Sequence, residues 1–366
     1  MDDLSRFCCL NRDCSDHGKR GHGNLTVPHR SGPNNTRLLR CSTCTSRFSE
    51  RTGTPLFGSR LSPETVADIL AHAAEGPARP LGRSASTATP SPGTCEWPAT
   101  TPNSGTTSPS LFPPTTTDVP SDETWDFVAK KEKNCEADEV HAGDCWDRVA
   151  LDPESRSVVR LVVGKRAAEA THELVRDFHR RTSGRIPRLM TSDEYPVSAD
   201  AIRTAYGRAV TPPRTGKPGR PRSPSRVRPA EVTCATGRKH EENNRAVRVS
   251  TAAVFGTLPA VVVALALARV SRAVNASFVE RHDGTDRGRC SRKGRKSYEF
   301  SKSWTAHGAA TRFSYFSDNF CWPVRTLRVK GGDGKWHPRT PAMAAGLTDH
   351  VWSIREWIAF PAVRRQ

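Results

Sequence analysis

The pattern of apolar residues between positions 121 and 195 limits the possible folds of this chain more than any other feature. Two runs, WDRVAL (146–151) and SVVRLVVGK (157–165), are rich in Val and Leu, and DPESR forms a turn between them. Residues 167–182 follow, with apolar side chains at helical spacing. A short run, IPRLMTS, then leads to Asp193. With the opening SDETWDFVAKKEK, the pattern predicts three strands, a helix and a further strand.

This order of elements is the order of a ribonuclease-H-like core, so the predicted fold class is α/β. In such a core Asp122 would lie on the first strand and Asp193 at the tip of the fourth, and those two strands are neighbours. The two carboxylates, 193 − 122 = 71 residues apart, could therefore meet and hold Mg²⁺, which prefers oxygen ligands. The chain has 38 acidic residues, however, and spacing alone favours the simpler interpretation of solvated carboxylates at strand ends.

The charge of the chain indicates the class of partner. With 366 residues there is room for two or three domains, and the formal net charge of +18 suggests a polyanion. The alternative is a ribosomal-type or merely basic soluble protein. No apolar run reaches the roughly 18 residues that span a bilayer, and the N-terminus is acidic and polar, unlike a signal peptide. We therefore expect a cytoplasmic protein without membrane contact.

Cysteine spacing predicts a metal site near the N-terminus. Cys9 and Cys14 form one pair and Cys41 and Cys44 a second, and four thiolates can close a tetrahedral structural Zn²⁺ site. Eleven cysteines without a secretion signal favour metal binding in a reducing compartment over disulfides. Cys8 is a rival first ligand, and a set of free buried thiols is the alternative interpretation.

The next segment combines a helix with a low-complexity run. Residues 61–76 predict a helix, with Ser62 as N-cap and Pro63 at the first helical position. Residues 83–120 contain 10 Thr, 8 Pro and 6 Ser, too few apolar groups to offset the entropy of ordering. We interpret this run either as a flexible linker or as the product of a frameshift. Codons for 81–99 can be chosen so that the neighbouring frame encodes an amphipathic helix, and this slightly favours the frameshift.

Two further regions carry basic or helical patterns. Residues 212–229 hold six cations and no acid, which suits an extended arm on DNA phosphates, although an unstructured basic loop explains them equally well. Residues 201–207 predict a short helix. Residues 259–284 predict a helix for most of their length, with an apolar spine at Val263, Leu267, Val270, Val274 and Phe278. Residues 286–304 are again basic, with aromatic residues interleaved.

Several long strings resemble one family. DETWDFVAKKEKNC, WDRVALDPESR, TSDEY, SFVERHDGTDR, NFCWPVRTLRVK and RTPAMAAGLTDHVWS stand in the order of the insertion-sequence-one-like DDE transposases of bacteria and cover most of 122–366. FCCLNRDCSDHGKRGHGNLTV resembles the zinc-binding start of the same family, whose spacing favours Cys9 over Cys8. Only the segment near 77–120 does not match, so the helix-turn-helix that would begin at 61–76 is incomplete.

The resemblance implies three catalytic carboxylates. Glu280 in the VER string would join Asp122 and Asp193, and the three would hold two Mg²⁺ or Mn²⁺ ions roughly 3.5–4 Å apart for phosphoryl transfer. Asp283 stands where relatives would carry an amide, and His282 would support the site. Glu123 should point away, because strand faces alternate. The residues expected to contact DNA are Arg214, Lys217, Arg220, Arg222, Arg281, Lys293, Arg295 and Lys296.

The function implied is that of a DNA transposase, which cuts the ends of its element and joins them to target DNA as a dimer or larger assembly. Loss of the helix-turn-helix would leave an inactive copy, and a non-catalytic zinc-ribbon DNA-binding protein is the alternative. The expected organisation is a zinc ribbon at 1–58, a helix-turn-helix remnant at 59–76, a linker or frameshifted segment at 77–120, a catalytic domain at 121–310 with a basic insertion at 211–230, and a C-terminal helical extension at 311–366.

Overall fold

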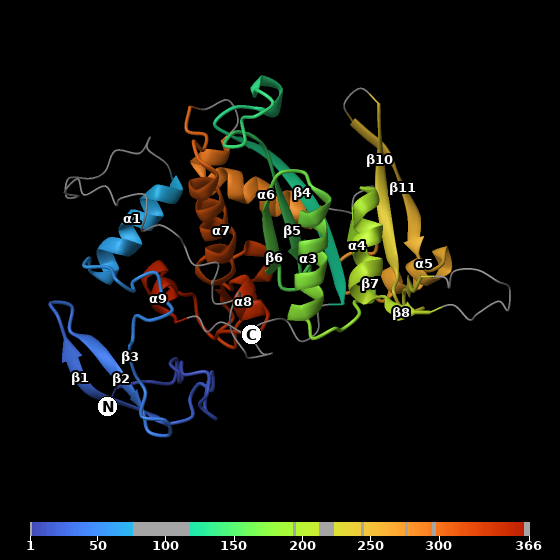
Figure 1. Cartoon of the computed structure of the whole chain (residues 1–366). Coiled ribbons are helices and arrows are strands. Elements are labelled where there is room, and N and C mark those ends of the chain that lie inside the picture. Colours follow the sequence, from blue (N-terminus) through green and yellow to red (C-terminus); the bar gives the residue numbers. More distant parts are fainter. Residues whose placement is uncertain are drawn as a thin grey trace.

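A six-stranded mixed sheet forms the body of the molecule (Figure 1). The structure is a computed structural model that describes residues 2–75, 117–192, 195–211, 223–242, 245–274, 277–294 and 298–361. The strand order is β11-β10-β7-β4-β5-β6. The strands are β4 (Asp118–Val128), β5 (Gly143–Leu151), β6 (Val158–Gly164), β7 (Leu189–Ser192), β10 (Cys234–Glu242) and β11 (Arg245–Phe255).

The directions of these strands divide the sheet into two parts. β4, β5 and β6 pair in antiparallel fashion, as the Val-rich runs and their short turns predict. β7 lies parallel to β4, and β10 lies parallel to β7. The predicted three strands and fourth strand are therefore confirmed, and the first and fourth are neighbours. β10 and the antiparallel edge strand β11 were not predicted from the sequence.

Helices cover both faces of this sheet. On one face α3 (Ala168–Arg181) packs Leu174 and Phe178 against Val119 and Ala150, and α4 (Pro196–Tyr206) lies beside α3. On the other face α7 (Trp304–Cys321) buries Phe313, Phe316 and Phe320 in a cluster with residues of β5 and β6. The apolar residues alternate along β5, so Val149 faces α7 while Ala150 faces α3. The result is a three-layer α/β body.

The predicted helix at 259–284 is two helices. α5 (Leu258–Ala266) and α6 (Ser277–Arg289) are separate, and Ser271 lies between them. The Ser271 hydroxyl accepts from the backbone N–H of Ala273 and donates to its carbonyl, an alternative to helical bonding. The prediction of one helix with a continuous apolar spine at 259–284 is therefore wrong. Val263 and Leu267 are exposed and Val274 is buried.

The N-terminal part is a small sheet followed by one helix. β1 (Leu25–Ser31), β2 (Thr36–Cys41) and β3 (Arg47–Ser49) form a three-stranded antiparallel sheet. α1 (Pro63–Glu75) follows, and the backbone N–H of Thr65 donates to the Ser62 hydroxyl at 3.1 Å, which confirms the predicted N-cap. Leu56 and Ala67 join the apolar cluster beneath α7. This part therefore packs onto the body of the molecule.

Two expected boundaries need correction. β4 begins at Asp118 and buries Val119 against α3, so the sheet starts inside the segment assigned to 77–120. The rest of the low-complexity run, residues 76–116, lies outside the described residues. The boundary expected at 310 falls within α7, which packs on the sheet and belongs to the body.

Short elements complete the chain. β8 (Arg208–Val210) and β9 (Ser225–Val227) pair at the base of the expected basic arm, whose residues 212–222 are not described. The remaining elements are η2 (Glu132–Asn134), η3 (Ser291–Lys293), η4 (Arg325–Leu327), β12 (Val329–Lys330), β13 (Trp336–His337), α8 (Pro341–Ala344) and α9 (Ile354–Ala359). Among the described residues, none of the helices has the length and apolar character required to cross a bilayer.

Candidate functional site

Four cysteines come together beside the N-terminal sheet. The Sγ atoms of Cys9, Cys14, Cys41 and Cys44 all lie within 4.8 Å of one another. Cys41 ends β2, and the turn that follows it carries Cys44 and returns to bond the Cys41 N–H to the Ser46 carbonyl. This arrangement can bind a metal such as zinc, because four thiolates at this separation suit tetrahedral coordination.

The surroundings of the cluster supply hydrogen-bond donors to sulfur, while burial raises the pKa of the Cys9 thiol. A hydrogen bond from the backbone N–H of Ser46 lowers the pKa of Cys44 to about 7. The Asp16 N–H donates to the Cys14 sulfur at 3.4 Å, and the Asn24 amide donates to the Cys41 sulfur at 3.6 Å. Such donors stabilise a metal-bound thiolate. Cys8 is also buried but is not a member of the cluster, and burial raises the pKa of its thiol. Cys9, the predicted ligand, occupies the first position.

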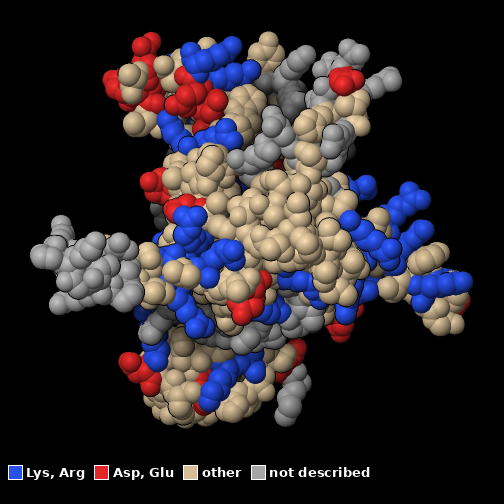
Figure 2. All heavy atoms as spheres, turned by 90° about the vertical axis from the view of Figure 1, so that its right-hand side faces the viewer, with Lys and Arg blue, Asp and Glu red and all other residues tan. Residues whose placement is uncertain are grey.

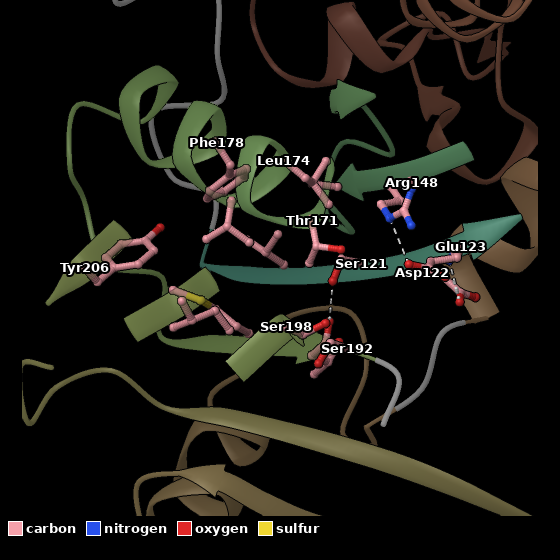
Figure 3. A pocket seen from close by; sticks show the side chains of 16 residues that line it. Ser121, Asp122, Glu123, Arg148, Thr171, Leu174, Phe178, Ser192, Ser198 and Tyr206 are labelled. Atoms are coloured by element: carbon pink, nitrogen blue, oxygen red, sulfur yellow. Dashed lines mark hydrogen bonds and ion pairs between the residues drawn. The ribbon is translucent and has the colours of Figure 1, made fainter. Parts of the chain in front are cut away.

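Asp122 lies in the middle of β4 on the face that carries α6 and α7. It pairs across the sheet with Val149, which packs beneath α7. Glu123 points to the opposite face, as predicted. It forms ion pairs with Arg148 at 2.9 Å and Arg166 at 3.1 Å, and the contact with Arg148 is drawn in Figure 3. The two adjacent carboxylates therefore have separate environments, and only that of Asp122 faces α6.

Helix α6 runs alongside β4 in the same direction. Near its start, Phe278 lines a small cavity together with Pro120 of β4. Further along α6, the carboxyl of Asp283 lies near the hydroxyl of Thr124. Glu280 lies between Phe278 and Asp283 on the helix, as Asp122 lies between Pro120 and Thr124 on the strand. The structure thus brings the segments that carry Asp122 and Glu280 side by side. Glu280 is exposed and Asp122 is half-buried.

Asp193 lies outside the described residues, together with Glu194. The described part of β7 ends at Ser192, one residue before it. The paired residues of β4 and β7 are Asp118 with Leu189, Val119 with Met190, and Pro120 with Thr191. The offset in every pair is 71 positions (189 − 118 = 71), which equals the sequence separation of Asp122 and Asp193.

The residues expected to contact DNA have mixed outcomes. Arg281 is exposed on α6, next to Glu280. Lys293 is not a surface cation. Its ammonium lies 2.6 Å from both Asp147 and Asp286, and only 4% of the residue is exposed. The prediction that Lys293 contacts a DNA phosphate is therefore wrong. The other candidates, Arg214, Lys217, Arg220, Arg222, Arg295 and Lys296, lie outside the described residues.

Buried ionisable groups between α6 and the sheet were not predicted. Asp147, Asp286 and His307 are almost fully buried, and the ligand atoms of Cys145, Asp147 and His307 lie within 4.8 Å of one another. This group is a poor cation site, because Lys293 already neutralises Asp147. The spacing of Val279, Asp283 and Asp286 along one helical face is the sequence signal that could have revealed the buried carboxylates.

A cavity on the opposite face of β4 lies between α3, α4 and the sheet (Figure 3). Its apolar end is lined by Leu174, Phe178 and Tyr206, and its polar end by Ser121, Asp122 and Ser198. Its volume is about 50 Å³, enough for a few water molecules. No residue of α6 lines it, so it does not connect Asp122 with Glu280.

On the side shown in Figure 2, Lys and Arg side chains flank a broad uncharged area. α5 lies on this side of the molecule (Figure 1), and its Leu258, Val262 and Val263 are exposed.

No protein-family model matches the chain, and no curated protein matches it.

Proposed function

We propose that the protein is a DNA transposase of the DDE class, with Asp122, Asp193 and Glu280 as its catalytic carboxylates. The observation that carries the proposal is the placement of β4 against both β7 and α6. The pairing offset of β4 and β7 equals the separation of the two aspartates, and α6, which carries Glu280, packs beside β4. Three carboxylates from three elements would then meet at one point.

The strand order supports the finer fold assignment. Strands β6-β5-β4-β7-β10 repeat the order and directions of a ribonuclease-H-like sheet, in which the first strand lies at the centre between the second and the fourth. β11 would be an addition at the edge. The N-terminal three-stranded sheet with its cysteine cluster would be a zinc ribbon.

The donor set fits Mg²⁺ or Mn²⁺. Carboxylate oxygens are the preferred ligands of these ions, whereas the N-terminal site offers only sulfur. Asp122 is half-buried and accepts a hydrogen bond from the backbone N–H of Glu123 at 2.8 Å, which orients its carboxylate. Glu280 is on the exposed side of α6, where a DNA backbone can reach it. When bound, the ions would supply activation of the attacking hydroxyl and stabilisation of the leaving oxygen.

The roles of the protein groups follow from this placement. Asp122, Asp193 and Glu280 would hold the ions, and Arg281 would bind a phosphate beside them. The basic arm at 212–229 and the zinc ribbon would bind duplex DNA away from the reacting phosphate. The net charge of +18 is consistent with a polyanionic substrate. We expect assembly of at least two chains on the element ends.

A nicking assay tests the proposal. The substrate is a supercoiled plasmid that carries the DNA ends flanking the gene, incubated with Mg²⁺ or Mn²⁺. We expect Asp122→Asn and Glu280→Gln to lower nicking by at least roughly 10²–10³-fold, since the ions supply several kcal/mol of the catalysis. DNA binding should survive. Glu169→Gln, an exposed carboxylate at the start of α3, is the matched control and should nick normally.

The same assay distinguishes the second candidate, a non-catalytic zinc-ribbon DNA-binding protein, which the cysteine cluster also supports. That protein would bind the plasmid and show no metal-dependent nicking in any variant. Normal nicking by both carboxylate variants would contradict the assignment of the catalytic residues.

A further inference from the structure

Helix α6 has little apolar surface with which to pack: Val279 is buried and Phe278 is half-buried against the same apolar cluster. The side chains that it buries are Val279, His282, Asp283 and Asp286, of which only the first is apolar. Most helices dock through an apolar stripe. A helix that buries carboxylates must instead be held by groups that pair with them, because an unpaired buried charge costs several kcal/mol.

Lys293 supplies the central pairing. Its ammonium lies 2.6 Å from Asp286 of α6 and 2.6 Å from Asp147 of β5, and it sits over the ring of Tyr315 of α7 at 4.7 Å. All of these side chains are buried. The Nζ atom of Lys293 therefore contacts α6, β5 and α7 at once.

Neighbouring bonds set the position of α6 along β4. Asp147 pairs in register with Thr124. Thr124 lies near Asp283, which accepts a hydrogen bond from the Tyr315 hydroxyl at 2.9 Å. On the far side of α6, His282 lies 3.5 Å from Asp318 of α7. Lys293 lies in η3, directly after α6, and its segment is hydrogen-bonded to the end of that helix. A slide of α6 by one turn would therefore separate Lys293 from Asp147 of β5 and move Asp283 away from Thr124.

We propose that Lys293, through Asp286 and Asp147, is a positioning residue that locks α6 in register on β4 and so holds Glu280 level with Asp122. The inference rests on the proposed function for the role of Glu280, but the lock itself is a property of the described residues. Lys293 acts through α6 and has no contact with substrate.

Hydrogen exchange of the metal-free protein tests the lock directly. Lys293→Met leaves two carboxylates facing each other and can prevent folding, so the decisive variant is Asp286→Ala. This variant removes the ion pair between Asp286 of α6 and Lys293, and it leaves Lys293 paired with Asp147. We expect amides of α6 to exchange at least about tenfold faster, while amides of β5 keep their protection. Asp286→Glu retains a carboxylate and should restore most of the protection.

A matched control shows whether any buried carboxylate would act in this way. Asp177 of α3 is buried on the opposite face and pairs with Arg160 at 2.8 Å and Arg181 at 2.7 Å. Asp177→Ala should loosen α3 and leave α6 unchanged. Unchanged exchange of α6 in Asp286→Ala, or equal loosening of α6 and β5, would overturn the proposal.

Cleavage of the chain by bound Fe²⁺, with ascorbate and peroxide, links the lock to the site. In the wild-type protein we expect cuts near residues 122 and 280. Asp286→Ala should keep the first cut and weaken the second at least about fivefold, whereas Asp177→Ala should keep both. Equal cuts in Asp286→Ala and wild type would contradict the positioning role. A wild-type protein cut at neither place would contradict the proposed function, and the exchange result would still decide whether Lys293 locks α6.

Discussion

At the scale of single residues, a contact could be predicted from the sequence where its partners are close together in the chain, and not where they are far apart. The cysteine pairs are local, and their ligand set follows from two short turns, so Cys9, Cys14, Cys41 and Cys44 could be predicted to converge. The burial of Lys293 could not be predicted from local spacing. Within a basic run it resembles a phosphate contact, but Asp147, 146 positions away in the chain, binds it in the interior.

Removal of one cysteine tests the metal assignment at this scale. We expect one Zn²⁺ per chain in the purified protein by elemental analysis. Cys41→Ser should lose the ion and destabilise the N-terminal sheet, because Cys41 is fully buried at the end of β2 and structural zinc contributes directly to folding. Cys8→Ser is the matched control and should retain the ion. Zinc-free wild-type protein, or loss of zinc from the control alone, would contradict the assignment.

At the scale of elements, the alternation and helical spacing of apolar residues predicted β5, β6, β7 and α3 well, because each buries a face against the sheet. The same spacing failed at 259–284. Val263 and Leu267 fit a helical spine but are exposed, since the chain leaves the helix before Ser271 and α6 packs through polar groups. Apolar spacing does not predict where a helix that docks through buried charges will lie.

The N-cap of α7, which packs on the sheet, gives a test of stability at this scale. Ser303 is the N-cap of α7, and its hydroxyl accepts from the backbone N–H of Ala306 at 3.2 Å. We expect Ser303→Ala to lower the free energy of unfolding by about 1 kcal/mol, measured by urea denaturation. Thr305→Ala changes an exposed residue in the first turn and should alter stability by less than about 0.5 kcal/mol. Equal stability of both variants would show that the cap is not used.

At the scale of the whole molecule, the parts are joined by contacts between residues far apart in the chain. The N-terminal part meets the C-terminal part through Arg355 and Glu64, 2.7 Å apart, and through Arg20, which lies over the ring of Phe360 at 4.6 Å. α7 crosses the boundary expected at 310 and completes the core of the sheet. The C-terminal residues are therefore part of one body with the proposed catalytic sheet.

DNA affinity is the prediction that belongs to this scale. We expect largely non-specific binding that weakens by roughly 10³-fold or more between 50 and 200 mM salt, because the proposed DNA contacts are made by cations to phosphates and the sequence predicts an incomplete helix-turn-helix. Arg281→Gln should lower the slope of log K against log salt by about 1, and Arg355→Gln, which pairs with Glu64 away from the proposed site, should leave it unchanged. Tight discrimination of one DNA end over random DNA at physiological salt would contradict this.

The amino-acid sequence by itself determined the elements whose burial is local and periodic, the thiolate cluster, and the candidate carboxylates by their resemblance to one family. The tertiary structure decided which residues meet. It placed β7 beside β4 with an offset of 71 positions, divided the predicted long helix in two, and set α6 on the sheet through Asp286 and Lys293. The physical reason is that the pairing of buried charges depends on distance in space, and no periodicity along the chain records which cation will meet a buried carboxylate.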